Sequence, residues 1–161
     1  MTDWAAVVTT VGALLAALLG YLVNSAINRR TERVRRYAEA LETIERYCQL
    51  PLMFYRLHDS SPETRARLVT MLGDTQVAIA FHRRFLEIDS PRVGKAYNQL
   101  ADKIGQQNHI YRTEALKSPP VKNDTEIEVP RGAYRIDNAV ELRLCVQAMR
   151  RELYLRWLPW R

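Results

Sequence analysis

The sequence lacks the residue patterns with which most catalytic and metal-binding sites are built. Its 161 residues include three histidines and two cysteines, and no HExxH, CxxC or His-x-x-x-His spacing is present. There is also no Gly-x-Ser-x-Gly, no phosphate-cradling glycine loop and no Gly-x-Gly-x-x-Gly. We therefore expect a non-enzymatic protein without a catalytic residue, a metal or a cofactor. A membrane-tethered enzyme stays open as an alternative, because catalytic groups in helical bundles can be scattered in sequence.

The two cysteines do not suggest a disulfide framework. Cys48 and Cys145 lie far apart in the sequence, each on the apolar stripe of a helix-forming segment. We expect both to act as small buried hydrophobic residues.

Charge is absent from residues 4–27, which read WAAVVTTVGALLAALLGYLVNSAI. At about 1.5 Å per residue, a helix of this length crosses a hydrocarbon layer about 30 Å thick. A signal peptide would carry cations before a shorter apolar core, whereas Asp3 precedes this one. We predict a retained transmembrane anchor over residues 1–28, with a buried soluble helix or a signal peptide as the alternatives.

The anchor is followed by a strongly cationic block. Residues 29–36 hold five arginines against one glutamate, and positive flanks stay in the cytoplasm. This places the N-terminus outside and the rest of the chain in the cytoplasm, with Arg29, Arg30 and Arg33 at the membrane surface. Twenty arginines against four lysines are consistent with a bacterial inner membrane.

Small residues recur every four positions in the anchor, at Gly12, Ala16, Gly20 and Asn24. This spacing lets two helix backbones approach closely in lipid. It predicts self-association or docking to another membrane protein, although small residues are also simply common in membrane helices.

The formal net charge of +6 is a reason to consider nucleic-acid binding. The cationic excess is concentrated at residues 29–36 and 150–161, and neither segment has the polar and small residues of a base-reading helix. The pattern argues against a nucleic-acid partner and favours membrane lipid.

Beyond the anchor, apolar residues follow helical spacing. We predict cytosolic helical hairpins over residues 29–116, with helices at about 29–58, 62–87 and 91–116. Ser61-Pro62 and Ser90-Pro91 have the chemistry of helix starts, and Pro51 should kink or break the first helix. The first helix should bury Val34, Tyr37, Leu41, Ile44 and Cys48. A Pro-rich loop over residues 117–134 should precede a C-terminal helix within residues 135–161.

The sequence thus predicts an all-α protein in which a single N-terminal transmembrane helix continues into a cytosolic antiparallel four-helix bundle. The fourth helix then returns to the membrane, so Trp157, Trp160 and Arg161 are expected at the membrane surface. Alternatively, Trp157 caps the bundle core and Trp160 belongs to a frayed tail. A possible anion site comprises Arg83, Arg84 and Arg92, at a junction that we place at the distal end of the bundle.

These features favour an oligomerisation or interaction module, or an accessory subunit of a membrane complex. A second hypothesis is an oligomeric membrane-permeabilising effector or small channel, in which Thr9, Thr10, Asn24 and Ser25 line a wet lumen.

Overall fold

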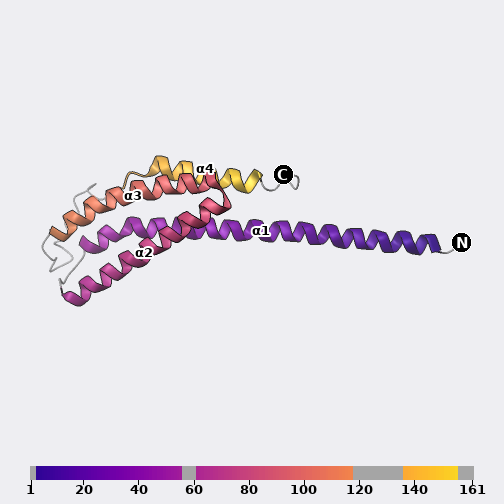
Figure 1. The fold of residues 1–161 in the computed structure, drawn as a ribbon, viewed down its shortest axis with the longest axis horizontal. Helices are drawn as coiled ribbons and strands as arrows, with labels where there is room; N and C mark the ends of the chain where they lie inside the picture. The colour runs from indigo at the N-terminus through magenta and orange to yellow at the C-terminus, as the bar shows by residue number, and fades with distance from the viewer. Residues whose placement is uncertain (1–2, 56–60, 118–135, 156–161) are drawn as a thin grey trace.

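The computed structural model describes residues 3–55, 61–117 and 136–155. Four helices and no strand lie in these ranges (Figure 1): α1 (Asp3–Tyr55), α2 (Pro62–Asp89), α3 (Pro91–Lys117) and α4 (Ala139–Leu155). The predicted all-α class is confirmed. The predicted loop after Lys117 and the segment with Trp157, Trp160 and Arg161 lie outside the described residues.

The first helix is much longer than the others. α1 has 53 residues, which corresponds to about 80 Å. No glycine or proline interrupts residues 21–50, so the backbone hydrogen bonds continue from the apolar stretch through the arginine block. We call residues 3–31 the extended half, because this part projects alone beyond the other helices, and residues 32–55 the packed half (Figure 1).

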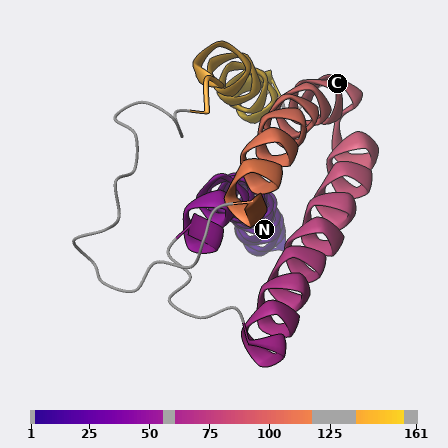
Figure 2. The ribbon, with the colours of Figure 1, turned by 90° about the vertical axis from the view of Figure 1, so that its left-hand side faces the viewer.

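The packed half of α1 forms a helical bundle with α2, α3 and α4. α3 contacts each of the other three helices, whereas the described parts of α2 and α4 do not contact each other. Figure 2 accordingly shows α3 between α2 and α4, with α1 beneath. α3 is therefore the central element of the bundle.

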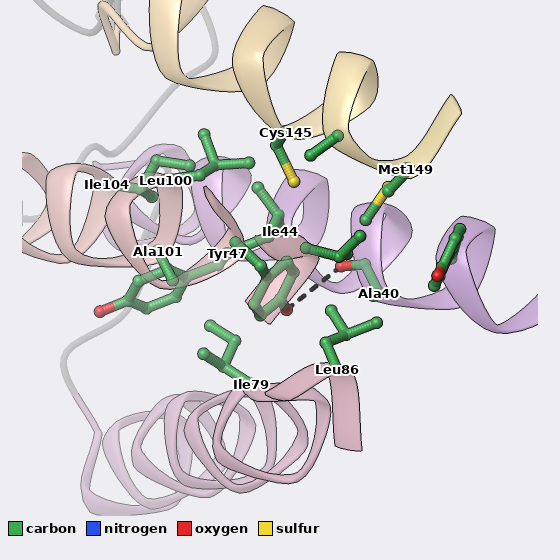
Figure 3. Close-up of a cluster of buried hydrophobic side chains, with 14 of the residues drawn as sticks. Ala40, Ile44, Tyr47, Ile79, Leu86, Leu100, Ala101, Ile104, Cys145 and Met149 are labelled. Carbon is green, nitrogen blue, oxygen red and sulfur yellow. Dashed lines mark hydrogen bonds between the residues drawn. The ribbon is translucent and has the colours of Figure 1, made fainter. Parts of the chain in front are cut away.

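The core is built from apolar residues at helical spacing, and Figure 3 shows several of them. Ile44, Leu86, Leu100, Ile104 and Cys145 are fully buried. Burying such an aliphatic side chain contributes about 1.5–3 kcal/mol relative to leaving it in water. Among these chains, the hydroxyl of Tyr97 donates to the carbonyl oxygen of Ala40 over 3.3 Å, the dashed line in Figure 3. This bond satisfies the one polar atom of a fully buried ring.

The buried face of α1 differs in part from the predicted one. Tyr37 and Ile44 are buried as predicted, but Val34 is 46% exposed, and Leu41 and Cys48 lie at the edge of the core. Ala40 and Tyr47 complete the buried face instead. The other helices contact α1 only from about residue 33 onward. They pack on the side of α1 that carries Tyr37, Ala40, Ile44 and Tyr47, and Val34 lies outside that side.

Pro51 does not break α1, which continues to Tyr55. Proline has no N–H, so the carbonyl of Tyr47, four residues earlier, loses its helical donor. The side-chain amide of Asn108 on α3 donates to this carbonyl over 2.6 Å and replaces that donor. Asn108 is one of two buried polar residues among those described, and this bond accounts for its place in the core.

The expected helix starts are both present. The Ser61 hydroxyl accepts from the N–H of Thr64, and Pro62 is the first residue of α2. Ser90 likewise accepts from the N–H of Val93, with Pro91 first in α3. Each serine supplies one acceptor to the unpaired N–H groups of a first turn, and each proline lacks an N–H that would go unpaired.

Candidate functional site

The extended half of α1 is apolar and uncovered. An 18-residue stretch of it has a mean hydropathy of 1.9, and none of that stretch is buried in the fold. Every side chain from Val7 to Asn24 is exposed. By length and composition, α1 is the one described helix that could cross a membrane.

The small residues of this half have no role in the fold itself. Gly12, Ala16, Gly20 and Asn24 are all exposed, and a Cβ added at Gly12 or Gly20 would meet no atom within 4 Å. Packing inside the monomer therefore does not require glycine at either position.

Glu32 pairs with two arginines of the cationic block. Its carboxylate accepts from Arg35 and Arg36 at 2.8 and 2.9 Å, and these hydrogen bonds lower the pKa of Glu32 to about 2. Arg29 and Arg30 are exposed one turn earlier. Arg33 instead turns toward α2, where its Nε donates to Asp89 over 3.1 Å. Of the three arginines predicted at a membrane surface, Arg33 thus has a structural partner in the bundle.

Asp89 is the centre of a polar cluster at the α2–α3 junction (Asp89–Arg92). It accepts from Arg33 and, over 2.8 Å, from the hydroxyl of Tyr37. Burial, and then the hydrogen bond to Asp89, raise the pKa of Tyr37 far above its ordinary value. The hydroxyl of Ser90 donates to Glu152 of α4 over 3.1 Å. Through these bonds the junction connects α1, α2, α3 and α4.

The junction is also closely packed, since Ser90 alone separates α2 from α3. A Cβ added at Gly94 would lie 2.7 Å from the Cα of Glu87, closer than two such atoms can approach. Gly94 therefore lets the two helices meet directly after the turn.

The predicted position of this junction was wrong. We expected it at the distal end of the bundle, beside Pro51. The contact of Asp89 with Arg33 places it at the opposite end, where the extended half of α1 leaves the bundle. The reason is the direction of α2, which starts after the far end of α1 and ends beside the arginine block.

The three arginines of the possible anion site have different surroundings. Arg83 donates to Asp102 of α3 over 2.5 Å beside an open pocket of about 500 Å³, whereas Arg84 and Arg92 are exposed. The Nε of Arg83 is buried without a hydrogen-bond partner. An anion in this pocket would have to compete with Asp102 for the guanidinium group.

The cysteines and histidines offer little chemistry in the part of the chain that the structure describes. Both cysteines are free; Cys145 is buried and Cys48 partly so. Burial raises the pKa of Cys48 to about 12 and that of Cys145 to about 11, so both are protonated at neutral pH. No group of three or more His, Cys, Asp or Glu that could hold a metal ion occurs among the described residues.

Sequence reasoning missed the polar cluster at the junction. Tyr37 was assigned to the core by its helical spacing, Ser90 was expected only as a helix cap, and Asp89 and Glu152 had no assigned role. The one available signal was the Asp-Ser-Pro sequence before α3, which marks a capped helix start but does not reveal its partners on α1 and α4.

No protein family, no curated protein and no solved structure matches this chain. The two features of this chain that point to a function are the extended half of α1 and the junction beside it.

Proposed function

We propose that the chain is a single-pass protein of a bacterial inner membrane with its N-terminus outside. The packed half of α1 and α2–α4 form an antiparallel bundle in the cytoplasm. In this proposal the protein is a non-enzymatic interaction module that self-associates or serves as an accessory subunit of a membrane complex.

One observation carries the membrane assignment: the most apolar stretch of the chain is also completely unburied. A core helix of a soluble protein would bury such a stretch in its own fold. In water, about 20 exposed apolar residues are unfavourable, and a bilayer removes that cost. The arginines that follow set the orientation.

Self-association is supported by the glycines of the extended half. Gly12 and Gly20 have open space around their Cα atoms, so the space left by the missing side chains is available to another helix.

The membrane assignment is tested on the full-length chain with a C-terminal tag expressed in bacteria. We expect the protein to stay in the membrane fraction after alkaline carbonate extraction. Protease should spare the tag in spheroplasts and remove it in inverted vesicles. Extraction by carbonate, or cleavage of the tag in spheroplasts, would contradict the proposal.

The association face is tested by cross-linking in mild detergent. G12L with G20L should abolish the cross-linked species. V11L with L18F enlarges side chains on the opposite face and serves as the matched control. Equal cross-linking of all three proteins would exclude the small-residue face.

The permeabilising alternative makes a different prediction in the same preparation. Vesicles that contain the wild-type chain would release an entrapped dye, and G12L with G20L would prevent the release. If no dye is released, the permeabilising alternative is excluded and the proposal of an interaction module is kept.

A further inference from the structure

Besides α1, two segments form the end of the bundle from which the extended half projects: the α2–α3 junction and the last turns of α4. Asp89 fixes the α2–α3 junction beside Arg33, and Glu152 fixes the last turns of α4 beside Ser90. Figure 1 shows both segments on the side toward which α1 extends. Arg33 comes six positions after Ile27, a rise of about 9 Å along α1.

Helix direction decides which side chains at this end point away from the bundle. The Cα–Cβ bond tilts toward the N-terminus of a helix. α1 comes from this side and α3 starts on it, whereas α2 and α4 end there. The exposed cations that lean outward are therefore Arg29 and Arg30 on α1 and Arg92 and Lys95 on α3.

The acidic groups at the same end are occupied by partners within the fold. Asp89 accepts from Arg33 and Tyr37, Glu152 accepts from Ser90, and Glu87 accepts from the amide of Asn98. Glu87 and Asp102 line an open pocket with Lys95, but Glu87 accepts from Asn98 and Asp102 accepts from Arg83, so the first turn of α3 still presents its cations to an external anion. Beside them, Ile88 is 84% exposed, more than any other large hydrophobic residue described.

We infer that the first turn of α3, through Arg92 and Lys95, docks the bundle on an anionic phospholipid surface beside Arg29 and Arg30. This inference rests on the proposed insertion of α1. A single helical anchor leaves the bundle able to turn about the helix axis, whereas a second contact on α3 fixes one face toward the bilayer. The spacing of about 9 Å is close to the screening length at physiological salt, so the attraction reaches the surface.

The test uses a fluorophore at the junction of the full-length chain. Ile88→Cys is labelled with an environment-sensitive nitrobenzoxadiazole maleimide, and the protein is reconstituted into vesicles. The native thiols react slowly, because both are protonated at neutral pH, with Cys145 buried and Cys48 partly buried. Val69→Cys, which replaces a 65% exposed residue near the other end of α2, is the matched control.

We expect a blue shift and quenching by headgroup-nitroxide lipid at position 88 and not at position 69. The effect should appear in vesicles of phosphatidylcholine and phosphatidylglycerol in equal parts, and should weaken with salt and in phosphatidylcholine alone. R92Q with K95Q should lower the ratio of docked to undocked protein about 25-fold, since each cation near an anionic surface contributes about fivefold. R65Q with R67Q removes two exposed cations from the first turns of α2 and should change nothing.

The two proposals fail in distinguishable ways. Carbonate extraction of the same vesicles reports insertion of α1 independently of the fluorophore. Resistance to extraction without quenching at position 88 would overturn the docking inference alone, and release by carbonate would overturn insertion. Equal quenching at positions 88 and 69, or a blue shift produced by duplex DNA without anionic lipid, would also overturn docking on lipid.

Discussion

The extended and packed halves of α1 belong to one unbroken helix, but among the described helices only the packed half is covered by α2, α3 and α4 (Figure 1). In the packed half, Tyr37, Ala40, Ile44 and Tyr47 are buried against the bundle, and polar residues occupy the outer face. In the extended half, apolar residues surround the whole helix and none of the side chains described there is buried. The same secondary structure is thus stabilised by tertiary packing in one half and requires a different environment in the other.

The largest effect should come from charging the extended half. We expect L14R with L18R to release the protein from membranes, because each arginine near the centre of a bilayer costs about 3 kcal/mol. The measurement is carbonate extraction. V77R, which replaces a 71% exposed residue of α2, is the control and should stay in the membrane fraction. If both proteins behave alike, the extended half and the exposed surface of the bundle share one environment, and the contrast between them is refuted.

Shortening a side chain should destabilise the bundle when the residue lies in the packed half of α1, but not when it lies in the extended half. I44A removes a fully buried side chain and should lower the free energy of unfolding of the bundle by about 2–5 kcal/mol. L18A removes a side chain that is 54% exposed and should leave that value unchanged. Urea denaturation in detergent, followed by tyrosine fluorescence, measures both. A loss of stability in L18A would show that the extended half packs on the bundle.

The contact of Asn108 with the carbonyl of Tyr47 should depend on Pro51. N108A should destabilise the bundle by about 1–3 kcal/mol, because a buried carbonyl loses its donor. In a P51A background the new N–H can bond to Tyr47, so the same substitution should cost less. A double-mutant cycle measures the difference, and equal costs in both backgrounds would refute the compensation.

Glycine substitutions contrast the close packing at the α2–α3 junction with the open space around the extended half. G94A should destabilise the bundle by about 1–3 kcal/mol, because its Cβ collides with the backbone of Glu87. G73A has open space and should be neutral or stabilising by up to about 1 kcal/mol. G12A should not change the unfolding of the bundle at all. Thermal unfolding in detergent gives the order, and an unchanged G94A would contradict the close approach of α2 and α3.

The smallest effect should be a pH dependence through His82. Burial lowers its pKa in the folded protein, while nearby Glu39 opposes the shift. The unfolded chain therefore takes up the proton more readily, and stability is lost as the pH falls below the ordinary histidine pKa of about 6.5. Denaturation at several pH values should show this loss, and H82Q should reduce it. An equal pH dependence in H82Q would assign the effect to other groups.

The sequence predicted the helical class and the starts of α2 and α3, because these depend on local chemistry. Ser61-Pro62 and Ser90-Pro91 begin helices by supplying an acceptor and a fixed backbone angle, whatever surrounds them. The apolar spacing of α4 likewise indicated Cys145 as a core residue.

The interactions between helices could not be predicted in the same way. The pairing of Asp89 with Arg33, and of Asn108 with Tyr47, joins residues more than 50 positions apart. Local periodicity does not tell which face of α1 the other helices approach, so Val34 was assigned to the core although it is exposed. The role of Gly94 depends on the path of α2 and has no signature in the residues around it.

The continuity of α1 through its arginine block has a mechanical consequence. From residue 28 to Tyr55 the helix is a stiff arm of about 40 Å, and a transmembrane helix that tilts by about 20° would swing the tip of such an arm sideways by about 14 Å. In the proposed topology, with no glycine hinge between residues 21 and 50, a change of lipid thickness or of a neighbouring helix would move the far end of the bundle directly.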